Sequence, residues 1–247
     1  RSTPWFDLTG CTNERDFDAR IARENNVDFV VALGGGSVMD ASKNLAMFIP
    51  QPSDNLWDYA NCPTGGKKTP PNKMLPWIAI TTSAGTGSEV DTIGVISNPE
   101  TDEKIGIGGM AGMFAKYAIV DPELAETMPV KLVAHTGMDA MTHAIEAYVS
   151  TANCDYTDPL ALHAIQMIKA NLVKSYNEDM DARDAMHNAQ CLAGMAFSNA
   201  LLGIVHSMAH KTGAAFEGGH IIHGAANAMY LPKVIKYNSK DPVAAER

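Results

Sequence analysis

The feature that most constrains the fold is a short apolar run that ends in three consecutive glycines. Residues 29–33 read Phe-Val-Val-Ala-Leu, and the segment 34–37 (Gly-Gly-Gly-Ser) precedes a stretch of helical composition that contains Asp40 and Lys43. A short run of large apolar residues without polar alternation is typical of a parallel strand buried on both faces. The sequence therefore predicts a buried strand, a tight turn and a helix, a building block of α/β folds.

The rest of the chain falls into two parts of different texture. Trp-Ile-Ala-Ile at 77–80 and Ala-Ile-Val at 118–120 predict two further buried strands, whereas residues 50–73, rich in Pro, Asn, Gly and Lys, predict a surface loop. We expect an α/β domain over residues 1–128, followed by an all-helical domain over residues 129–247. In the second domain, abundant Ala, Met, Leu and His predict packed helices over 131–150, 158–176, 181–204 and 205–216.

The charge and cysteine content argue against several classes of protein. Asp and Glu number 28 against 19 Lys and Arg, and the net charge of −9 argues against nucleic acid or an anionic membrane as a partner. We expect no membrane span and no signal peptide, because no apolar run is long enough and the first residues lack a basic, then apolar, pattern. The four widely spaced cysteines, without a CxxC pair, predict reduced thiols and a cytoplasmic protein.

Two segments have the composition of phosphate-binding loops. Glycines between a strand and a helix let the backbone approach a phosphate, and the first turn of the helix presents free N–H groups; residues 34–37 fit this pattern. The segment 81–89 (Thr-Thr-Ser-Ala-Gly-Thr-Gly-Ser-Glu) follows the second predicted strand and contains five hydroxyl side chains and two glycines. A tight turn and a solvated loop are the plain alternatives, but two such loops after two strands favour a dinucleotide site.

The helical part contains a pattern suited to a metal ion. Asp139 and His143 are four residues apart, and His206 and His210 repeat that spacing. On a helix such pairs project from one face, one turn apart, so both members can reach the same ion. His220 and His223 follow with a spacing of three residues. A carboxylate with several imidazoles suits Zn²⁺ or Fe²⁺, and the alternative is that each histidine only fills the core or caps a helix.

These segments, taken in order, match the motifs of one enzyme family. From about residue 27 to about residue 238, the sequence resembles the iron-containing (group III) alcohol dehydrogenases, in particular a primary-alcohol, butanol dehydrogenase-like branch. The resemblance implies a dehydroquinate synthase-like architecture, with a dinucleotide-binding α/β domain before a helical metal-binding domain. The matching segments are GGGSVMDASK at 34–43, TTSAGTGSE at 81–89, KYAIVDPEL at 116–124, TGMDAMTHAIEAYVS at 136–150, HSMAHKTGAAF at 206–216 and HGAANAMYLPKVIKYN at 223–238.

The resemblance also implies a role for each matched residue. His210 is expected beside the nicotinamide, as a catalytic residue on the path of the proton. The expected metal ligands, for Fe²⁺ or Zn²⁺, are Asp139, His143, His206 and His223. The residues expected to bind NAD or NADP are Gly35, Gly36, Ser37 and Asp40 at the pyrophosphate, Thr82, Ser83, Thr86 and Ser88 along the cleft, and Lys104.

The sequence departs from the family pattern at three points. We find no counterpart of the family's first nucleotide-binding strands before residue 27, and the family continues with further helices beyond this chain. We therefore expect both domains to be incomplete, the first at its start and the second at its end. The segment between the HxxxH pair and the last metal ligand is also longer than usual, so His220 is an alternative to His223 as that last ligand. We prefer His223 because its neighbours keep the local motif.

The implied reaction is transfer of a hydride between a primary alcohol or aldehyde and NAD(P), in a protein that forms a homo-dimer or a larger homo-oligomer. A glycerol dehydrogenase-like oxidation of polyols is an alternative on the same scaffold. A second alternative is a truncated family member that binds metal or a partner chain without turnover. A metal-storage or metal-sensing domain is disfavoured, because it would not need two donor-rich loops.

Overall fold

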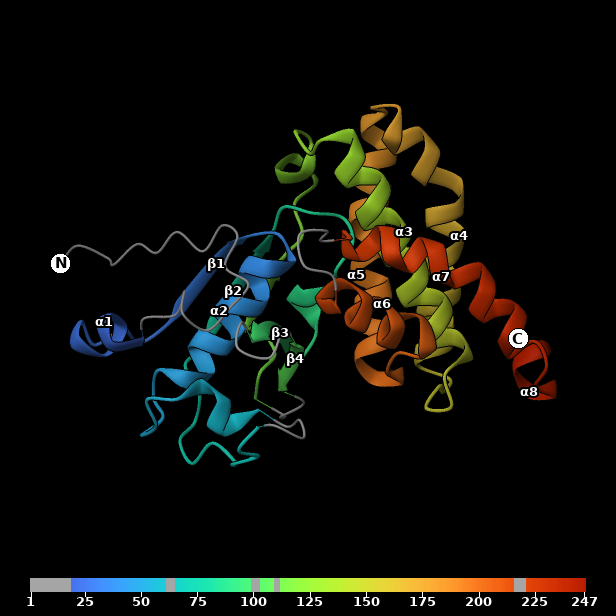
Figure 1. The fold of residues 1–247 in the computed structure, drawn as a ribbon. Helices are drawn as coiled ribbons and strands as arrows, with labels where there is room; N and C mark the ends of the chain where they lie inside the picture. Colours follow the sequence, from blue (N-terminus) through green and yellow to red (C-terminus); the bar gives the residue numbers. More distant parts are fainter. Residues whose placement is uncertain (1–18, 61–64, 99–102, 109–111, 216–220) are drawn as a thin grey trace.

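The α/β part of the molecule is a small parallel sheet with one helix packed on it. The computed structural model describes residues 19–60, 65–98, 103–108, 112–215 and 221–247 (Figure 1). Strands β1 (Val30–Gly34), β2 (Trp77–Thr81) and β5 (Tyr117–Ile119) are parallel, in the order β1-β2-β5. The three predicted strands thus exist and share one sheet, which confirms the α/β interpretation of this half.

Helix α2 (Gly36–Phe48) begins directly after β1 and covers one face of the sheet. Its Met39 and Ala46 form a buried cluster with Ala32, Trp77 and Ala79 of the two longer strands. On the opposite face, Val31 and Leu33 are each 50% exposed, and Tyr117 is 66% exposed. The prediction of a strand buried on both faces is therefore wrong for β1, because successive side chains point to opposite faces and α2 covers only one of them.

An antiparallel hairpin that the sequence analysis did not predict lies beside α2. Its strands are β3 (Ile93–Asn98) and β4 (Glu103–Gly108), paired from Ile93 with Gly108 to Asn98 with Glu103. Ile96, Ile105 and Ile107 pack in one buried cluster with Leu45 and Phe48 of α2. Short elements complete this half: α1 (Ala19–Glu24), η2 (Leu56–Tyr59), η3 (Ser88–Val90) and η4 (Pro122–Ala125).

The second half is helical, as predicted (Figure 1). Helices α3 (Val130–Val149), α4 (Thr157–Tyr176) and α5 (Met180–Ala200) pack together through small buried side chains such as Ala144, Ala164 and Ala189. Small residues let helix backbones approach closely, which brings the polar side chains of α3 close to neighbouring helices. The remaining helices are α6 (Ile204–Ala215), α7 (His223–Asn238) and α8 (Pro242–Ala245).

The break between α5 and α6 corrects the prediction of one helix over 181–204. Helix α5 ends at Ala200, and Leu201 adopts a positive φ of 66° before α6 begins at Ile204. The two helices are bent by 102° at this break, which turns α6 toward the α/β half. In the part of the chain that the structure describes, no single helix is long and apolar enough to cross a membrane, and only this bent pair reaches that length and composition.

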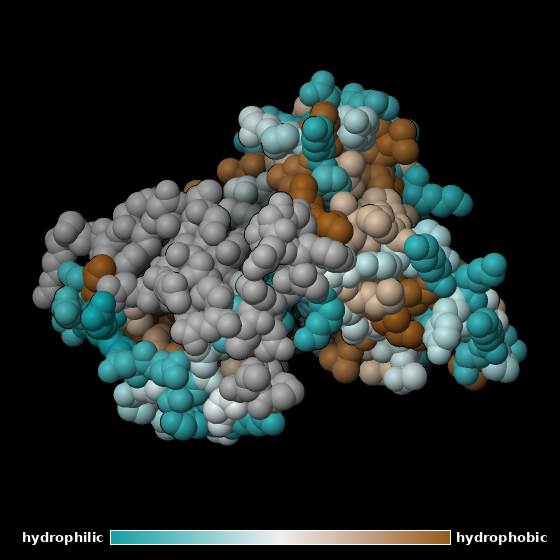
Figure 2. Space-filling view, in the orientation of Figure 1, coloured by the Kyte–Doolittle hydropathy of each residue, from teal (hydrophilic) through white to brown (hydrophobic). Residues whose placement is uncertain are grey.

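Hydrophobic side chains reach the surface on the helical half (Figure 2). Large apolar residues with substantial exposure occur on α4 and α7, among them Leu162, Val173, Met229 and Ile235. Exposed apolar side chains of this kind can contribute to a contact with another protein surface where they form a patch.

Candidate functional site

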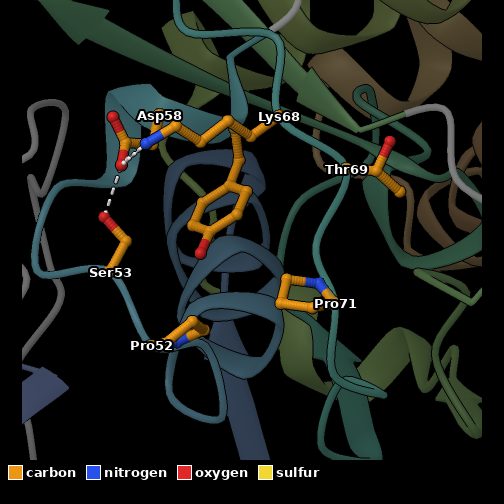
Figure 3. Close-up of a pocket in the computed structure, with 7 residues that line it drawn as sticks. Pro52, Ser53, Asp58, Lys68, Thr69 and Pro71 are labelled. Carbon is orange, nitrogen blue, oxygen red and sulfur yellow. Dashed lines mark hydrogen bonds and ion pairs between the residues drawn. The ribbon is translucent and has the colours of Figure 1, made fainter.

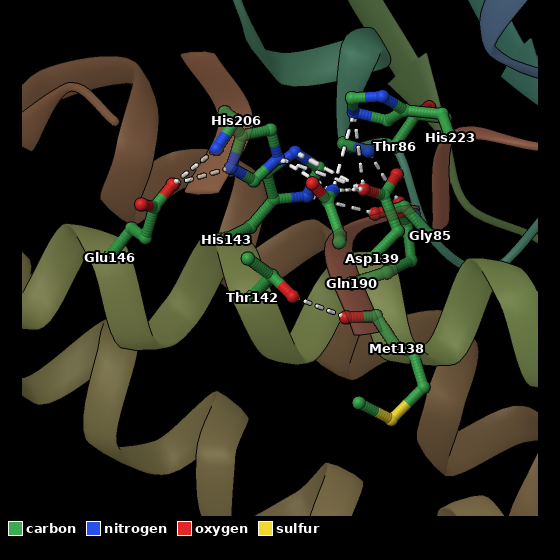
Figure 4. A network of polar contacts seen from close by, with 12 residues as sticks. Gly85, Thr86, Met138, Asp139, Thr142, His143, Glu146, Gln190, His206 and His223 are labelled. Carbon is green, nitrogen blue, oxygen red and sulfur yellow. Dashed lines mark hydrogen bonds and ion pairs between the residues drawn. The ribbon is translucent and has the colours of Figure 1, made fainter. Parts of the chain in front are cut away.

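Three helices bring a carboxylate and three imidazoles to one point. Helix α3 carries Asp139 and His143 one turn apart on its buried face, His206 lies in the first turn of α6, and His223 begins α7. Asp139, His143 and His206 are at most 5% exposed. The turn of the chain at Leu201 and the start of α7 place the two later histidines over the middle of α3 (Figure 4).

The ligand atoms have the spacing that a single ion requires. Asp139 Oδ1 lies 4.0 Å from His143 Nε2, 3.6 Å from His206 Nε2 and 3.5 Å from His223 Nε2. Donor atoms at about 2.1 Å from a tetrahedral ion lie roughly 3.4 Å from one another. The ligand atoms of Asp139, His143 and His206 all lie within 4.8 Å of one another, and the donor set fits Zn²⁺ or Fe²⁺. The rival residue His220 lies outside the described residues.

Hydrogen bonds at the outer nitrogen fix two of the imidazole rings. His143 Nδ1 is 3.2 Å from the carbonyl oxygen of Gly85, and His206 Nδ1 is 2.6 Å from Glu146 Oε2. Because a carbonyl and a carboxylate only accept, both Nδ1 atoms donate, which leaves each Nε2 atom, on the side of Asp139, as the nitrogen that can bind a metal. The Phe197 ring stacks on His143 with centroids 4.4 Å apart and shields that side of the cluster.

The sequence analysis missed two polar residues that contact the cluster. Asn227 Nδ2 donates to Asp139 Oδ1 at 2.6 Å and lies 3.2 Å from His206 Nε2 and 3.3 Å from His223 Nε2. Glu146 is the second. Both had a signal in the sequence, since Asn227 is four residues after His223 and Glu146 three after His143, the spacing of one helix face.

Burial and opposite charge set the protonation of the cluster. Burial opposes the charge on Asp139, yet His143, His206 and His223 hold the pKa of its carboxyl below the usual range. Burial lowers the pKa of His143 and of His223 to about 4. Burial also opposes the charge on His206, but Asp139 and Glu146 raise its pKa to about 9. At neutral pH the cluster thus offers one carboxylate and two neutral imidazoles, and a bound cation would displace the proton of the third.

His210 and Lys104 lie beside the cluster. The ring of His210 is 4.9 Å from that of His223 and 6.3 Å from that of His206, measured between centroids. Burial lowers the pKa of His210 to about 4, and the charges of His206 and Lys104 add to that effect. Burial also lowers the pKa of Lys104, which is close enough to feel the charges of both Asp139 and Asp40. Lys104 of β4 therefore lies near both Asp139 of the cluster and Asp40 of α2.

The two donor-rich loops pack against each other at the start of α2. Thr82 N donates to the Gly34 carbonyl at 3.0 Å, and a Cβ atom on Gly36 would lie only 2.5 Å from Thr86 Cγ2. Helix α2 begins at Gly36, its N-cap residue Gly35 supplies no side-chain cap, and Ser37 is exposed in the first turn. The buried hydroxyl of Ser83 lacks a partner in the described structure and lies against Gly35. Free N–H groups with an unused hydroxyl fit a phosphate.

Asp40 and Ser88 are joined in a buried polar network behind these loops. Asp40 accepts hydrogen bonds from Ser88 Oγ at 2.5 Å and from Val95 N at 3.0 Å. Lys43 forms a buried ion pair with Asp91 and donates to Ser88 Oγ at 3.1 Å. Both oxygens of Asp40 are thus used inside the protein, where they hold the second loop against α2 and β3.

One glutamine ties the second loop to the helical half. Gln190 of α5 accepts from Gly87 N at 2.8 Å and donates to Glu89 Oε1 at 2.6 Å. Gly87 has a φ of 63°, a left-handed conformation that favours glycine, and its Cα lies against Gly194 of α5. Since Gly85 of the same loop contacts His143, the loop that faces the α2 N-terminus also contacts the histidine cluster.

A separate hollow lies in the loop region after α2 (Figure 3). Its acidic group is already partnered, because Asp58 Oδ2 accepts from Ser53 Oγ at 2.6 Å and pairs with Lys68 Nζ at 2.7 Å. The carboxylate of this hollow is therefore already used in contacts within the protein. Its lining residues are Pro52, Ser53, Asp58, Tyr59, Lys68, Thr69 and Pro71.

Fold and site together define the class of protein. A parallel sheet with donor-rich loops after its strands, followed by helices that gather an aspartate and three histidines, is the dehydroquinate synthase-like architecture expected above. Solved structures agree with this architecture. Sulfoacetaldehyde reductase from Bifidobacterium kashiwanohense, solved with NAD+, matches with a TM-score of 0.85 and 34% identity, over 94% of this chain and 60% of that one.

The chain belongs to the iron-containing alcohol dehydrogenase family. The family model "iron-containing alcohol dehydrogenase" matches residues 15–122, and the model for the C-terminal part of the family matches residues 133–247. The NADPH-dependent butanol dehydrogenase of Clostridium saccharobutylicum is 51% identical over 225 residues, which are 90% of this chain and 55% of that protein. The iron-containing alcohol dehydrogenase of Thermococcus thioreducens matches with a TM-score of 0.83 and 34% identity, over 92% of this chain and 58% of that one. The chain thus spans just over half the length of these relatives.

Proposed function

We propose that this protein is a metal-dependent oxidoreductase that transfers a hydride between a small primary alcohol or aldehyde and NAD(P). One observation carries the proposal: three imidazole Nε2 atoms lie within 4.0 Å of one carboxylate oxygen, Oδ1 of Asp139. The site lies beside a loop that also contacts an uncapped helix N-terminus. A histidine cluster with a purely structural role would not need contact with a loop that also faces an uncapped helix N-terminus.

We assign Asp139, His143, His206 and His223 as the ligands of an Fe²⁺ or Zn²⁺ ion. A divalent ion at this point supplies Lewis-acid polarisation of the alcohol or aldehyde oxygen. Asp139 brings a negative charge, which acts strongly because Asp139, His143 and His206 are buried, whereas the side chain of His223 is 26% exposed. His210 is the candidate catalytic residue that carries the proton, because its ring contacts that of His223 and burial keeps it neutral.

We assign the start of α2 and the loop 81–89 to the dinucleotide. Gly35, Gly36 and Ser37 offer backbone and hydroxyl donors to the pyrophosphate, and Ser83 has a buried hydroxyl without a partner. Asp40 and Ser88 contribute indirectly, because the hydrogen bond between them holds the loop 81–89 in place. Thr82, Thr86 and Lys104 complete the set of residues assigned to the cofactor. The proposal includes both NAD and NADP, because one relative is named as NADPH-dependent and another was solved with NAD+.

The similarity to a butanol dehydrogenase supports a short primary alcohol as the substrate class. We further propose that the α/β and helical domains meet at 128/129, because β5 ends at Ile119 and α3 begins at Val130. A homo-oligomer is supported by exposed apolar side chains on α4 and α7, and a cytoplasmic location by the free thiols of Cys154 and Cys191.

The experiment that tests this function measures metal and activity on one sample. Protein purified without oxygen is analysed for iron and zinc, and the same sample is assayed for NAD- and NADP-linked oxidation of butanol. We expect about one metal ion per chain, and we expect His143→Ala to lose metal and turnover together while the exposed His163→Ala keeps both. Full metal and a normal rate in His143→Ala would contradict the assignment. A titration of the protein with NADH or NADPH that leaves the nicotinamide fluorescence unchanged would favour a non-catalytic protein.

A further inference from the structure

We propose that Glu146 is the positioning residue of this site, and that it holds His206 in the orientation and tautomer that expose Nε2 to the metal. The proposal rests on the metal site assigned above and adds a residue outside that ligand set. Glu146 lies on α3, seven residues after Asp139 and three after His143, on the same face of the helix. Its carboxylate reaches across to the first turn of α6 (Figure 4).

The carboxylate of Glu146 makes three contacts with the start of α6. Its Oε2 atom lies 2.6 Å from His206 Nδ1 and accepts from the His206 backbone N–H at 3.3 Å. Its Oε1 atom accepts from the backbone N–H of Val205 at 2.7 Å. Glu146 is 4% exposed and His206 is 3% exposed, so water does not compete for these bonds. One side chain therefore fixes both the backbone and the ring of His206.

The direction of the ring hydrogen bond determines the tautomer. A carboxylate only accepts, so Nδ1 of His206 carries a proton, and Nε2, on the side of Asp139, is the nitrogen left to bind a metal. Carboxylates that bind the outer nitrogen of a ligating histidine orient the ring and increase its basicity, and their loss typically lowers metal affinity by roughly 10–100-fold. Glu146 has the geometry of such a partner.

Gly203 lies directly against the carboxylate of Glu146. A Cβ atom on Gly203, in the turn before α6, would lie 2.8 Å from Glu146 Oε1. The absence of a side chain at this position lets the carboxylate approach the first N–H groups of the helix. Gly203→Ala would therefore displace the carboxylate without changing the charge at residue 146.

Glu146→Gln is the primary test because it keeps the size of the side chain. If the amide oxygen faces Val205 N–H, the NH₂ group faces His206 Nδ1 and favours a proton on Nε2, where the metal would bind. If the amide is reversed, its NH₂ group faces the N–H of Val205, and two donors cannot form a hydrogen bond. Either arrangement loses a contact, and we expect the Kd for Zn²⁺, measured by competition with a chromogenic chelator, to rise roughly 10–100-fold.

The matched control is Asp179→Ala, which removes a helix cap far from the cluster. Asp179 accepts from Ala182 N at 3.0 Å at the start of α5. We expect this variant to lower the melting temperature but to keep the wild-type Kd for Zn²⁺ and the visible spectrum of bound Co²⁺. Both Glu146→Gln and Gly203→Ala should change that spectrum. Circular dichroism of the metal-free proteins establishes that each variant is folded, and Gly203→Ala decides alone if Glu146→Gln does not fold.

The outcomes separate this inference from the function on which it rests. Wild-type Zn²⁺ affinity in folded Glu146→Gln and Gly203→Ala would overturn the role of Glu146 and leave the metal site intact. An equal loss of affinity in Asp179→Ala would also overturn it, because general destabilisation would then explain the effect. Failure of the wild-type protein to bind Zn²⁺ or Fe²⁺ would overturn the proposed function itself.

Discussion

The buried ion pair behind the cofactor loops allows a quantitative prediction. Lys43 has a fully buried side chain that pairs with Asp91 and donates to Ser88 Oγ and to the Ile93 carbonyl, each at 3.1 Å. Lys43→Met keeps most of the volume but leaves the Asp91 carboxylate buried without its cation. Removal of one partner from a buried pair costs about 3–5 kcal/mol. We expect a loss of that size in the free energy of unfolding at pH 8, measured by urea denaturation.

The pH dependence of Lys43→Met and the stability of a double variant provide two further tests of this prediction. Burial raises the pKa of Asp91 to about 7 although Lys43 opposes the shift, so Lys43→Met raises that pKa further. A carboxyl whose pKa is higher in the folded than in the unfolded state loses stability as the pH rises, so the variant should be less impaired at pH 6 than at pH 8. Lys43→Met/Asp91→Asn should regain at least half of the loss. A single variant within about 1 kcal/mol of wild type, or no recovery in the double variant, would refute the reasoning.

Three further predictions concern the site and the core. His210→Ala should keep its metal but slow alcohol oxidation, as measured by metal analysis and steady-state kinetics; loss of metal would place His210 among the ligands. Gly36→Ala should weaken binding of NADH or NADPH at least about 10-fold in a fluorescence titration, and Thr86→Ser in the same chain should restore it, because the new Cβ would meet Thr86 Cγ2 at 2.5 Å. His187 is fully buried with no partner for either ring nitrogen in the described structure, so His187→Leu should raise the free energy of unfolding by about 1–2 kcal/mol. Burial lowers the pKa of His187, so wild type should lose stability below about pH 6.5, and denaturation across pH 5–8 should be flatter in the variant.

The sequence was sufficient to predict the parallel strands and most of the helices. The unbroken apolar runs at 29–33, 77–80 and 118–120 predicted three strands, which overlap β1, β2 and β5, and all three lie in one parallel sheet. The exposed face of β1 could not be predicted, because an apolar run does not tell which of its two faces another element covers. The hairpin β3-β4 was missed because its glycines and polar residues weaken the strand pattern.

The break at Leu201 escaped prediction for a different reason. Leu and Ile on both sides of Gly203 suit a helix, and nothing local indicates the positive φ of Leu201. That break places His206 over α3, so the site depends on a feature that the local sequence hides.

The candidate site was predictable where its residues share one helix. Asp139 and His143 follow from a spacing of four residues, and the structure places them as that spacing requires. The spacing from His143 could have singled out Glu146, but its contact with His206 joins residues 60 apart in the chain, so the local pattern does not predict the partner. The same applies to Asn227, whose partner Asp139 is 88 residues away. The binding of a metal by Asp139, His143, His206 and His223 stays a prediction.

The most direct test of the account is a crystal structure of the metal-loaded protein with anomalous data at the iron and zinc absorption edges. The account predicts one peak, at roughly 2.1 Å from the Asp139 carboxylate and from the Nε2 atoms of His143, His206 and His223. A stoichiometric metal ion bound elsewhere, or one held through His220 in place of His223, would contradict the ligand set on which the proposed chemistry depends.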